Sequence, residues 1–244
     1  MKRPEMILFD YGHTLLYEPD WDTERGDRAL FSHAVKNPNN CGVDDIRKEV
    51  REVFGLIERV KVEMDVEIPC TIGDRLVYDH LGIEFSLSPL EQEIVFWTAA
   101  CPGAVMPGAA EMLDELRSMG IRTGVISNNG WSGAALLDRL DRLLVHNSFE
   151  FVLSSADYMI RKPDRRLFEI ALTKAGLAPE SVWFCGDHFE KDVLGAHRAG
   201  LFPVWYEDDS VGRSPTNPKT AAEPDFPCLH IRRWDQLTDV LRDL

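Results

Sequence analysis

Five polar residues stand at the ends of predicted strands or just before a predicted helix, and their side chains could do chemistry. These residues are Asp10, Ser127, Asn128, Lys162 and Asp187. A carboxylate can act as a nucleophile or hold a metal ion, whereas a hydroxyl and an ammonium can hold an anion. Each residue alone also has a structural explanation, as a helix cap, a turn residue or a solvated charge.

The elements that would position these residues alternate between short apolar strands and helices. We predict strands at 6–9, 121–127, 149–154, 181–185, 202–206 and, at an edge, 229–232. We predict helices at 109–119, 131–144, 164–175, 190–199 and 234–244. This alternation predicts an α/β fold with a Rossmann-like parallel sheet and right-handed crossovers. Ligands of such sheets gather at the carboxyl ends of the strands, which is where the five polar residues fall.

The segment at 16–104 has a different pattern and reads as helices without convincing strands. Apolar residues recur there at three- and four-residue steps, and Asp44 or Asp45 could cap the first long helix. We therefore predict an inserted all-helical cap domain at 16–104 and a Rossmann-like core domain at 1–15 and 105–244. The polar segment 207–227, rich in Pro, Ser and Thr, is predicted to be a surface loop.

Composition excludes several classes of protein. The 244 residues carry 27 Lys+Arg and 41 Asp+Glu, a formal net charge of −14, which argues against a nucleic-acid partner. No apolar run approaches the ~18 residues of a membrane span. The apolar run after Lys2 and Arg3 ends at Asp10, so we expect no signal peptide. Five scattered cysteines fit reduced thiols, and we expect a soluble, cytoplasmic monomer or homodimer with no membrane partner.

Five short segments, in this order along the chain, resemble motifs of the haloacid dehalogenase-like (HAD) hydrolase superfamily. They are 9–15 (FDYGHTL), 125–129 (VISNN), 161–164 (RKPD), 185–192 (CGDHFEKD) and 195–200 (GAHRAG). Each segment alone is a weak signal, whereas the ordered set is specific and runs from residue 6 to about residue 206. The helical insert lies where the helical-cap type, subfamily I, places its cap.

The resemblance implies a Mg²⁺ cofactor. Its ligands would be the carboxylates of Asp10 and Asp187 and the backbone carbonyl of Gly12, with waters and phosphate completing an octahedron. Asp192 would orient the water ligands of the metal without binding the metal itself.

The resemblance also implies covalent catalysis on a small phosphorylated substrate. Asp10 would attack phosphorus and form an aspartyl-phosphate, which divides one difficult displacement into two. Ser127 and Asn128 would hold phosphoryl oxygens, and the Lys162 ammonium would neutralise the phosphate and steady Asp10.

The first motif departs from that of the family's phosphatases, which carry a second aspartate two residues after the nucleophile as general acid and base. Here that position is Gly12, and His13 follows where the family usually has glycine. General acid–base catalysis contributes typically ~10²–10⁴-fold, so its loss need not abolish activity. We expect a slow enzyme, or one restricted to good leaving groups. His13 and His188 are the nearby candidates for carrying protons.

Three functions fit the sequence, and we favour a Mg²⁺-dependent hydrolase of a small phosphorylated metabolite. A carbon–halogen or carbon–phosphorus hydrolase is the second: dehalogenases carry tyrosine at the position of Gly12, whereas carbon–phosphorus hydrolases carry a small residue there. The latter also need a cap lysine for a Schiff base, and the insert offers Lys36, Lys48 and Lys61. The third is a non-catalytic protein that binds a phosphorylated ligand or a partner protein. Pure binding does not require a nucleophile such as Asp10.

Overall fold

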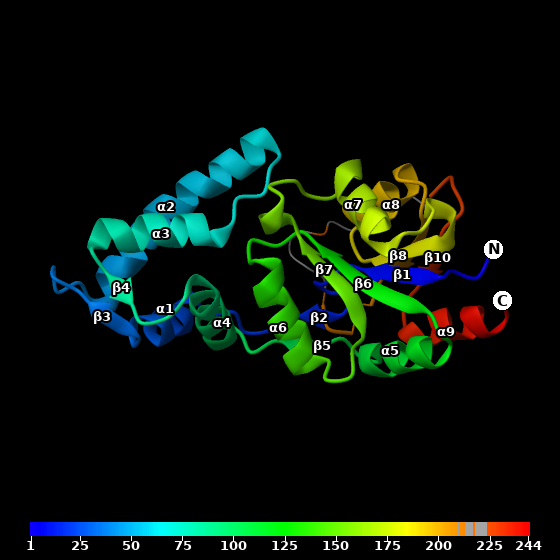
Figure 1. Cartoon of the computed structure of the whole chain (residues 1–244), viewed down its shortest axis with the longest axis horizontal. Helices are drawn as coiled ribbons and strands as arrows, with labels where there is room; N and C mark the ends of the chain where they lie inside the picture. The colour runs from blue at the N-terminus through cyan, green and yellow to red at the C-terminus, as the bar shows by residue number, and fades with distance from the viewer. Residues whose placement is uncertain (209, 213–216, 218–223) are drawn as a thin grey trace.

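The computed structural model describes residues 1–208, 210–212, 217 and 224–244. Within these residues the centre is a six-stranded sheet with the order β10-β9-β8-β1-β6-β7, and its paired strands are all parallel (Figure 1). The strands are β1 (Met6–Phe9), β6 (Arg122–Ser127), β7 (Phe149–Ser154), β8 (Val182–Gly186), β9 (Phe202–Tyr206) and β10 (Leu229–Ile231). The predicted α/β class with a Rossmann-like parallel sheet is confirmed, and so is the edge strand near residue 230.

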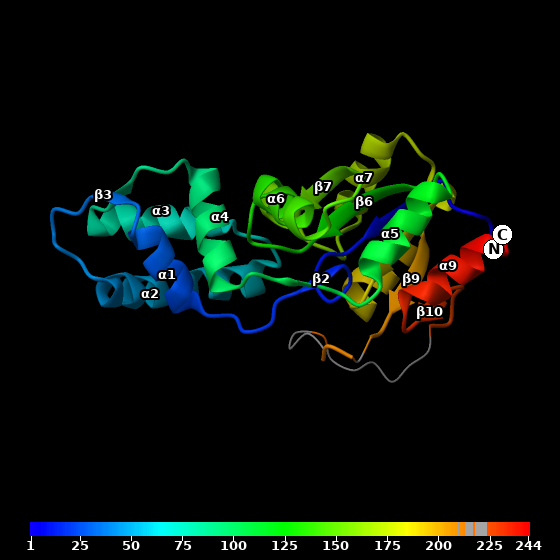
Figure 2. The same cartoon turned by 90° about the horizontal axis from the view of Figure 1, so that it is seen from below.

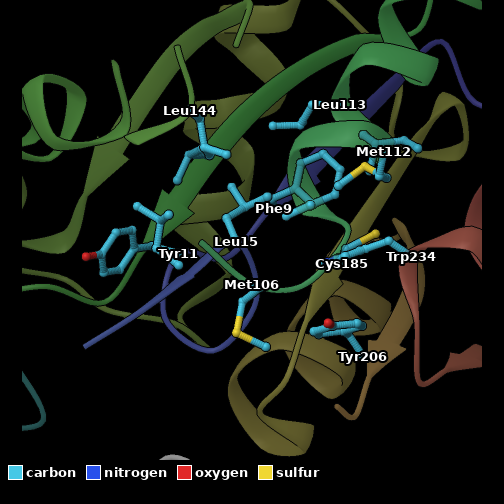
Figure 3. Packing of buried hydrophobic residues seen from close by; sticks show 14 of the residues in the cluster. Phe9, Tyr11, Leu15, Met106, Met112, Leu113, Leu144, Cys185, Tyr206 and Trp234 are labelled. Carbon is cyan, nitrogen blue, oxygen red and sulfur yellow. The ribbon is translucent and has the colours of Figure 1, made fainter. Parts of the chain in front are cut away.

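Helices cover both faces of the sheet, as residues of β1 illustrate. Ile7 and Phe9 face one hydrophobic cluster, while Met6 and Leu8 face another, because successive side chains of a strand point to opposite faces. The first cluster is closed by α5 (Ala109–Ser118), α6 (Gly133–Leu143) and α9 (Trp234–Arg242), and the second by α7 (Arg165–Ala175) and α8 (Gly195–Arg198). Figure 3 shows the first cluster gathering around Phe9. A central strand buried on both faces gives the site beside it a rigid base.

The inserted helices lie beside this sheet and have a hydrophobic cluster of their own. They are α1 (Thr23–Phe31), α2 (Val43–Met64), α3 (Cys70–Leu81) and α4 (Pro89–Ala100). Their cluster is centred on Ile46, Val53 and Val77, all buried. Figures 1 and 2 show α1–α3 at one end of the molecule and the two chain termini at the other. The division into cap and core domains at the bounds given above stays a prediction.

The prediction that the insert contains no strands is wrong. Two short antiparallel pairs occur: β3 (Ala34–Lys36) with β4 (Glu84–Phe85), and β2 (Leu16–Tyr17) with β5 (Ala104–Val105). Strands of two or three residues are too short to show the alternation by which a strand is recognised in a sequence. The β2–β5 pair joins the two chain segments that lead into and out of the insert.

Two helix boundaries also differ from expectation. The N-cap of α2 is Gly42, and Asp45 acts from the first turn, where its carboxylate accepts a hydrogen bond of 2.8 Å from the Gly42 N–H. The helix predicted at 190–199 begins as a π-helical segment, η3 (Phe189–Leu194), and only α8 is α-helical. The 3₁₀ turns are η1 (Ser155–Asp157) and η2 (Pro179–Ser181). Part of the loop predicted at 207–227 lies outside the described residues.

Among the described helices, none combines the length and the hydropathy that a membrane span requires.

Candidate active site at the carboxyl edge of the sheet

The strand-end residues predicted from the sequence lie together at one edge of the sheet. β1 runs between β6 and β8, so Asp10 stands in the middle of that edge. Its backbone N–H donates to the Cys185 carbonyl at 2.8 Å, which continues the ladder one residue past the strand. Ser127 ends β6 and is buried, and Asp187 directly follows β8. Three neighbouring parallel strands therefore deliver a carboxylate, a hydroxyl and a second carboxylate to one place.

Lys162 joins these residues from the loop before α7. Its side chain is almost completely buried, and its Nζ lies 2.6 Å from Asp10 Oδ1 and 2.7 Å from Asp192 Oδ1. Burial by itself lowers the pKa of Lys162, but the two carboxylates outweigh burial and hold the pKa above its usual value. Lys162 is therefore a fixed cation between two acids.

Asn128 holds the backbone of Lys162 in place. Its Nδ2 donates to the Lys162 carbonyl at 2.8 Å, and its Oδ1 accepts from the Lys162 N–H at 2.7 Å. One donor and the acceptor of this side chain are thus engaged in holding Lys162, and the second N–H of Nδ2 is left over for another acceptor. Sequence reasoning predicted the phosphate contact and missed the clamp, because the two residues are 34 positions apart.

Three carboxylates crowd this edge. One oxygen from each of Asp10, Asp187 and Asp192 lies within 4.8 Å of the other two. Burial, together with the nearby charges of Asp192 and Asp10, raises the pKa of Asp187 to about 8. Burial also raises the pKa of Asp10 to about 6, although Lys162 acts in the opposite direction. The cluster therefore disfavours its own negative charges.

The donor set fits a divalent cation bound through oxygen. Three carboxylates against one ammonium leave an excess of two negative charges, which a dication would balance. Carboxylate oxygens are the ligands that Mg²⁺ prefers in proteins. Asp192 belongs to the same cluster of carboxylates as Asp187. Its position therefore fits either direct binding of the metal or contact with the metal through a water ligand.

Gly12 and Asn217 lie beside the cluster of three carboxylates. Gly12 lines the cavity above the site, and a Cβ added to it would find no atom of the described residues within 4 Å. Asn217 Nδ2 donates to the Asp187 carbonyl at 2.8 Å and to Asp187 Oδ2 at 2.9 Å. No sequence motif pointed to Asn217, which comes from the polar segment after β9.

Both candidate proton carriers border the cavity. Burial lowers the pKa of His13 and that of His188. Both imidazoles are therefore neutral near pH 7 and able to accept a proton. His13 has a φ of 53°, in the left-handed region that glycine adopts with the least steric strain. This backbone conformation explains why the family usually has glycine at this position. The His188 N–H donates to Asp192 Oδ2 at 3.0 Å.

The cavity over the site measures about 410 Å³ and is lined in part by Tyr17, the last residue of β2, and by Glu18 and Trp21, which follow that strand. Among the residues that the structure describes, no lysine of the insert lines this cavity. Lys36 is paired with Glu84 and Lys61 with Glu67, while Lys48 is exposed. None of the three insert lysines is thus placed to serve as the Schiff-base lysine that a carbon–phosphorus hydrolase requires.

A buried polar network below the cavity was not anticipated from the sequence. Arg139 of α6 is completely buried, and its Nε donates to Tyr11 Oη at 2.8 Å. Tyr11 Oη in turn donates to Glu18 Oε1 at 3.0 Å, and Arg139 Nη2 donates to the Cys101 carbonyl at 2.8 Å. Burial and then the charge of Glu18 raise the pKa of Tyr11. One arginine thus joins the residue after Asp10 to both chain segments that connect the insert.

Comparison with known proteins gives a consistent assignment. The family model described as haloacid dehalogenase-like hydrolase matches residues 103–205. A glyceraldehyde 3-phosphate phosphatase of Methanopyrus kandleri is 32% identical over 145 residues, which cover 57% of this chain and 57% of that protein. A phosphoserine phosphatase of Thermus thermophilus is 38% identical over 123 residues, covering 49% and 45% respectively. The matched segments thus span about half the length of these relatives.

The fold of the whole chain is also found among solved structures. A 2-haloacid dehalogenase from Pseudomonas syringae superposes with a TM-score of 0.60 at 22% identity, covering 98% of both chains. At this identity the likeness concerns the fold alone. The family match over residues 103–205 and the ordered motifs around Asp10 and Lys162 make the chain similar to the haloacid dehalogenase-like hydrolases.

Proposed function

We propose that this protein is a Mg²⁺-dependent hydrolase that removes a phosphoryl group from a small phosphorylated metabolite through an aspartyl-phosphate at Asp10. The observation that carries the proposal is the buried Lys162 ammonium, 2.6 Å from Asp10 and 2.7 Å from Asp192 at the edge of the sheet. A non-catalytic binding protein would not need a carboxylate oriented in this way. The phosphatase names of the relatives support the same reaction class.

The residues of the chain divide the reaction between them. A carboxylate oxygen of Asp10 attacks phosphorus, the bond from phosphorus to the leaving oxygen breaks, and water later cleaves the aspartyl-phosphate. Lys162 offsets the charge of the phosphoryl oxygens and keeps Asp10 in one orientation, and the Ser127 hydroxyl donates to the same group. Asp10, Asp187 and the Gly12 carbonyl would hold Mg²⁺. When bound, that ion supplies charge neutralisation between the two anions that must meet.

Because position 12 is a glycine and carries no acid, the range of leaving groups that the enzyme can expel is limited. An alkoxide that departs without a proton is a poor leaving group, whereas a carboxylate or nitrophenolate anion departs readily. We therefore propose that acyl phosphates and activated esters are the better substrates, unless His13 or His188 carries the proton. The segment 16–104 would act as a cap that closes over the cavity and excludes water.

The replacement Asp10→Asn tests the proposed nucleophile. Hydrolysis of acetyl phosphate and p-nitrophenyl phosphate with Mg²⁺ should fall by about 10³-fold or more, since an amide cannot attack phosphorus. In acid-quenched wild-type enzyme, mass spectrometry should find phosphate on the peptide that contains Asp10.

The matched control is Asp79→Asn, which changes an exposed residue of α3 outside the cavity. Its rates should equal those of the wild type. Undiminished turnover by the Asp10→Asn variant would refute the nucleophile. Binding of Mg²⁺ and phosphate by the wild type without turnover of any phosphorylated metabolite would instead support the non-catalytic alternative.

A further inference from the structure

The part of the cavity that receives the leaving group includes a carboxylate. A phosphoryl group must lie beside Asp10 and Lys162, so the rest of the substrate extends toward the other lining residues. Three of these are Tyr17, the last residue of β2, and Glu18 and Trp21 in the segment that follows it. Glu18 is the charged residue among these three, and its side chain is 30% exposed.

One of the two carboxylate oxygens of Glu18 makes the contacts that hold this side chain in place. Oε1 accepts from Trp97 Nε1 at 2.7 Å and from Tyr11 Oη at 3.0 Å, and it lies 3.4 Å from Arg139 Nη2. No described residue donates a hydrogen bond to Oε2. Because the residue lines the cavity and is partly exposed, Oε2 is available as an acceptor whose position is set by the buried network below it.

The cations of the cavity lie elsewhere. Lys162 is paired with Asp10 and Asp192, and Lys191 belongs to η3, the same segment as Asp192. Among the cavity-lining residues at 17–21, none is a cation. A second anionic group on the substrate would thus approach Oε2 of Glu18 from the cavity, whereas the nearest cation, Arg139, is buried and lies beside the other oxygen, Oε1. A hydroxyl, amide or ammonium group could instead donate to that oxygen.

We propose that Glu18 is a specificity-determining residue that favours leaving groups with a hydrogen-bond donor and rejects those with a second negative charge. This inference rests on the proposed function and narrows its substrate class to phosphorylated compounds with no further anionic group near the phosphate. The discrimination should be seen in KM more than in kcat, since Glu18 contacts the part of the substrate that does not react.

Two isosteric esters test this proposal directly: 4-carbamoylphenyl phosphate and 4-carboxyphenyl phosphate. One carries an amide at the position where the other carries a carboxylate. Both have a phenolic leaving group with an electron-withdrawing substituent. The wild type should prefer the carbamoyl ester by about tenfold or more in kcat/KM, because like charges brought together are costly. In Glu18→Gln the preference should fall by most of that factor, since glutamine offers a donor to the carboxylate. The difference in intrinsic reactivity between the two leaving groups is the same for both enzymes and cancels when their preferences are compared.

Glu24→Gln is the matched control. Glu24 is also paired with arginine, and its side chain is 36% exposed, but it lies on α1 outside the cavity. Its selectivity should match that of the wild type. Equal kcat/KM of the wild type for the two esters would leave the proposed function standing and overturn the role of Glu18, even if Glu18→Gln failed to fold. Turnover of neither ester by the wild type would overturn both proposals.

Discussion

At the scale of single residues, Gly12 is the position where a change should add chemistry. The cavity has room for a side chain there, since a Cβ would meet nothing within 4 Å among the described residues. Gly12→Asp should therefore supply the missing general acid and raise the hydrolysis rates of substrates with poor leaving groups by up to ~10²-fold. The measurement is the slope of log kcat/KM against leaving-group pKa for a series of phosphate esters, which should become shallower in the variant.

The control for this change is Gly12→Asn, which has nearly the same volume but carries no acidic proton. Its slope should stay as steep as that of the wild type. A shallow slope in the wild type itself would contradict the idea and point to His13 or His188 as the proton carrier.

At the scale of elements, the connection between α2 and α3 is joined to the end of β7 by a buried acid. Glu67 is 1% exposed; its Oε1 lies 2.7 Å from Lys61 Nζ, and its Oε2 accepts from Ser155 Oγ at 3.0 Å. Ser155 Oγ also accepts from the Asn129 N–H at 2.9 Å, next to the residue that clamps Lys162. The Glu67 carboxylate and the Ser155 hydroxyl thus connect the insert to the loop that is predicted to bind phosphate.

Lys61→Met should reduce the free energy of unfolding by about 2 kcal/mol, because removing one partner leaves Glu67 buried without its counter-ion. Lys36→Met is the comparison, since that lysine pairs with Glu84 at a surface where both side chains are more than half exposed. It should cost less than about 1 kcal/mol. Urea unfolding of the two variants measures both values. Equal losses would mean that the Lys61–Glu67 pair contributes no more than a surface pair.

At the scale of the whole molecule, protons and Mg²⁺ should compete for the same acids and so link stability to pH. Without metal, the pKa values of Asp187 and Asp10, about 8 and about 6, lie above the ordinary value for aspartate, about 3.9. Between about pH 4 and pH 8 the folded protein therefore binds more protons at these groups than the unfolded chain does. Their contribution to stability is largest at low pH and is lost as pH rises through the raised values.

Mg²⁺ must displace these protons, so it should raise Tm more at pH 8 than at pH 6. Thermal unfolding with and without Mg²⁺ at the two pH values measures this difference. In Asp187→Asn the rise should largely disappear at both pH values, since one of the carboxylates is gone. A rise of the same size at pH 6 and pH 8 in the wild type would contradict the assignment of these acids as ligands.

The sequence alone determined the class of the fold and the place of the site. The strands at 149–154 and 202–206 were predicted with their observed bounds, since each is a run of apolar residues between clear turn signals. Asp10 and Asp187 were placed correctly because a residue that follows a buried parallel strand must lie at the carboxyl edge of the sheet. Both predictions rest on local patterns and one topological rule.

Only the tertiary structure decided which side chains touch one another. Arg139 meets Tyr11 across 128 positions of sequence, and Asn128 clamps Lys162 across 34. The pairing of Glu18 with Arg139 likewise joins two segments that are distant in the chain. Such contacts leave no periodicity and no spacing in the sequence, because they arise when separate elements pack and buried polar groups must find partners. That requirement, and not any local motif, decides which oxygen of Glu18 remains free for a substrate.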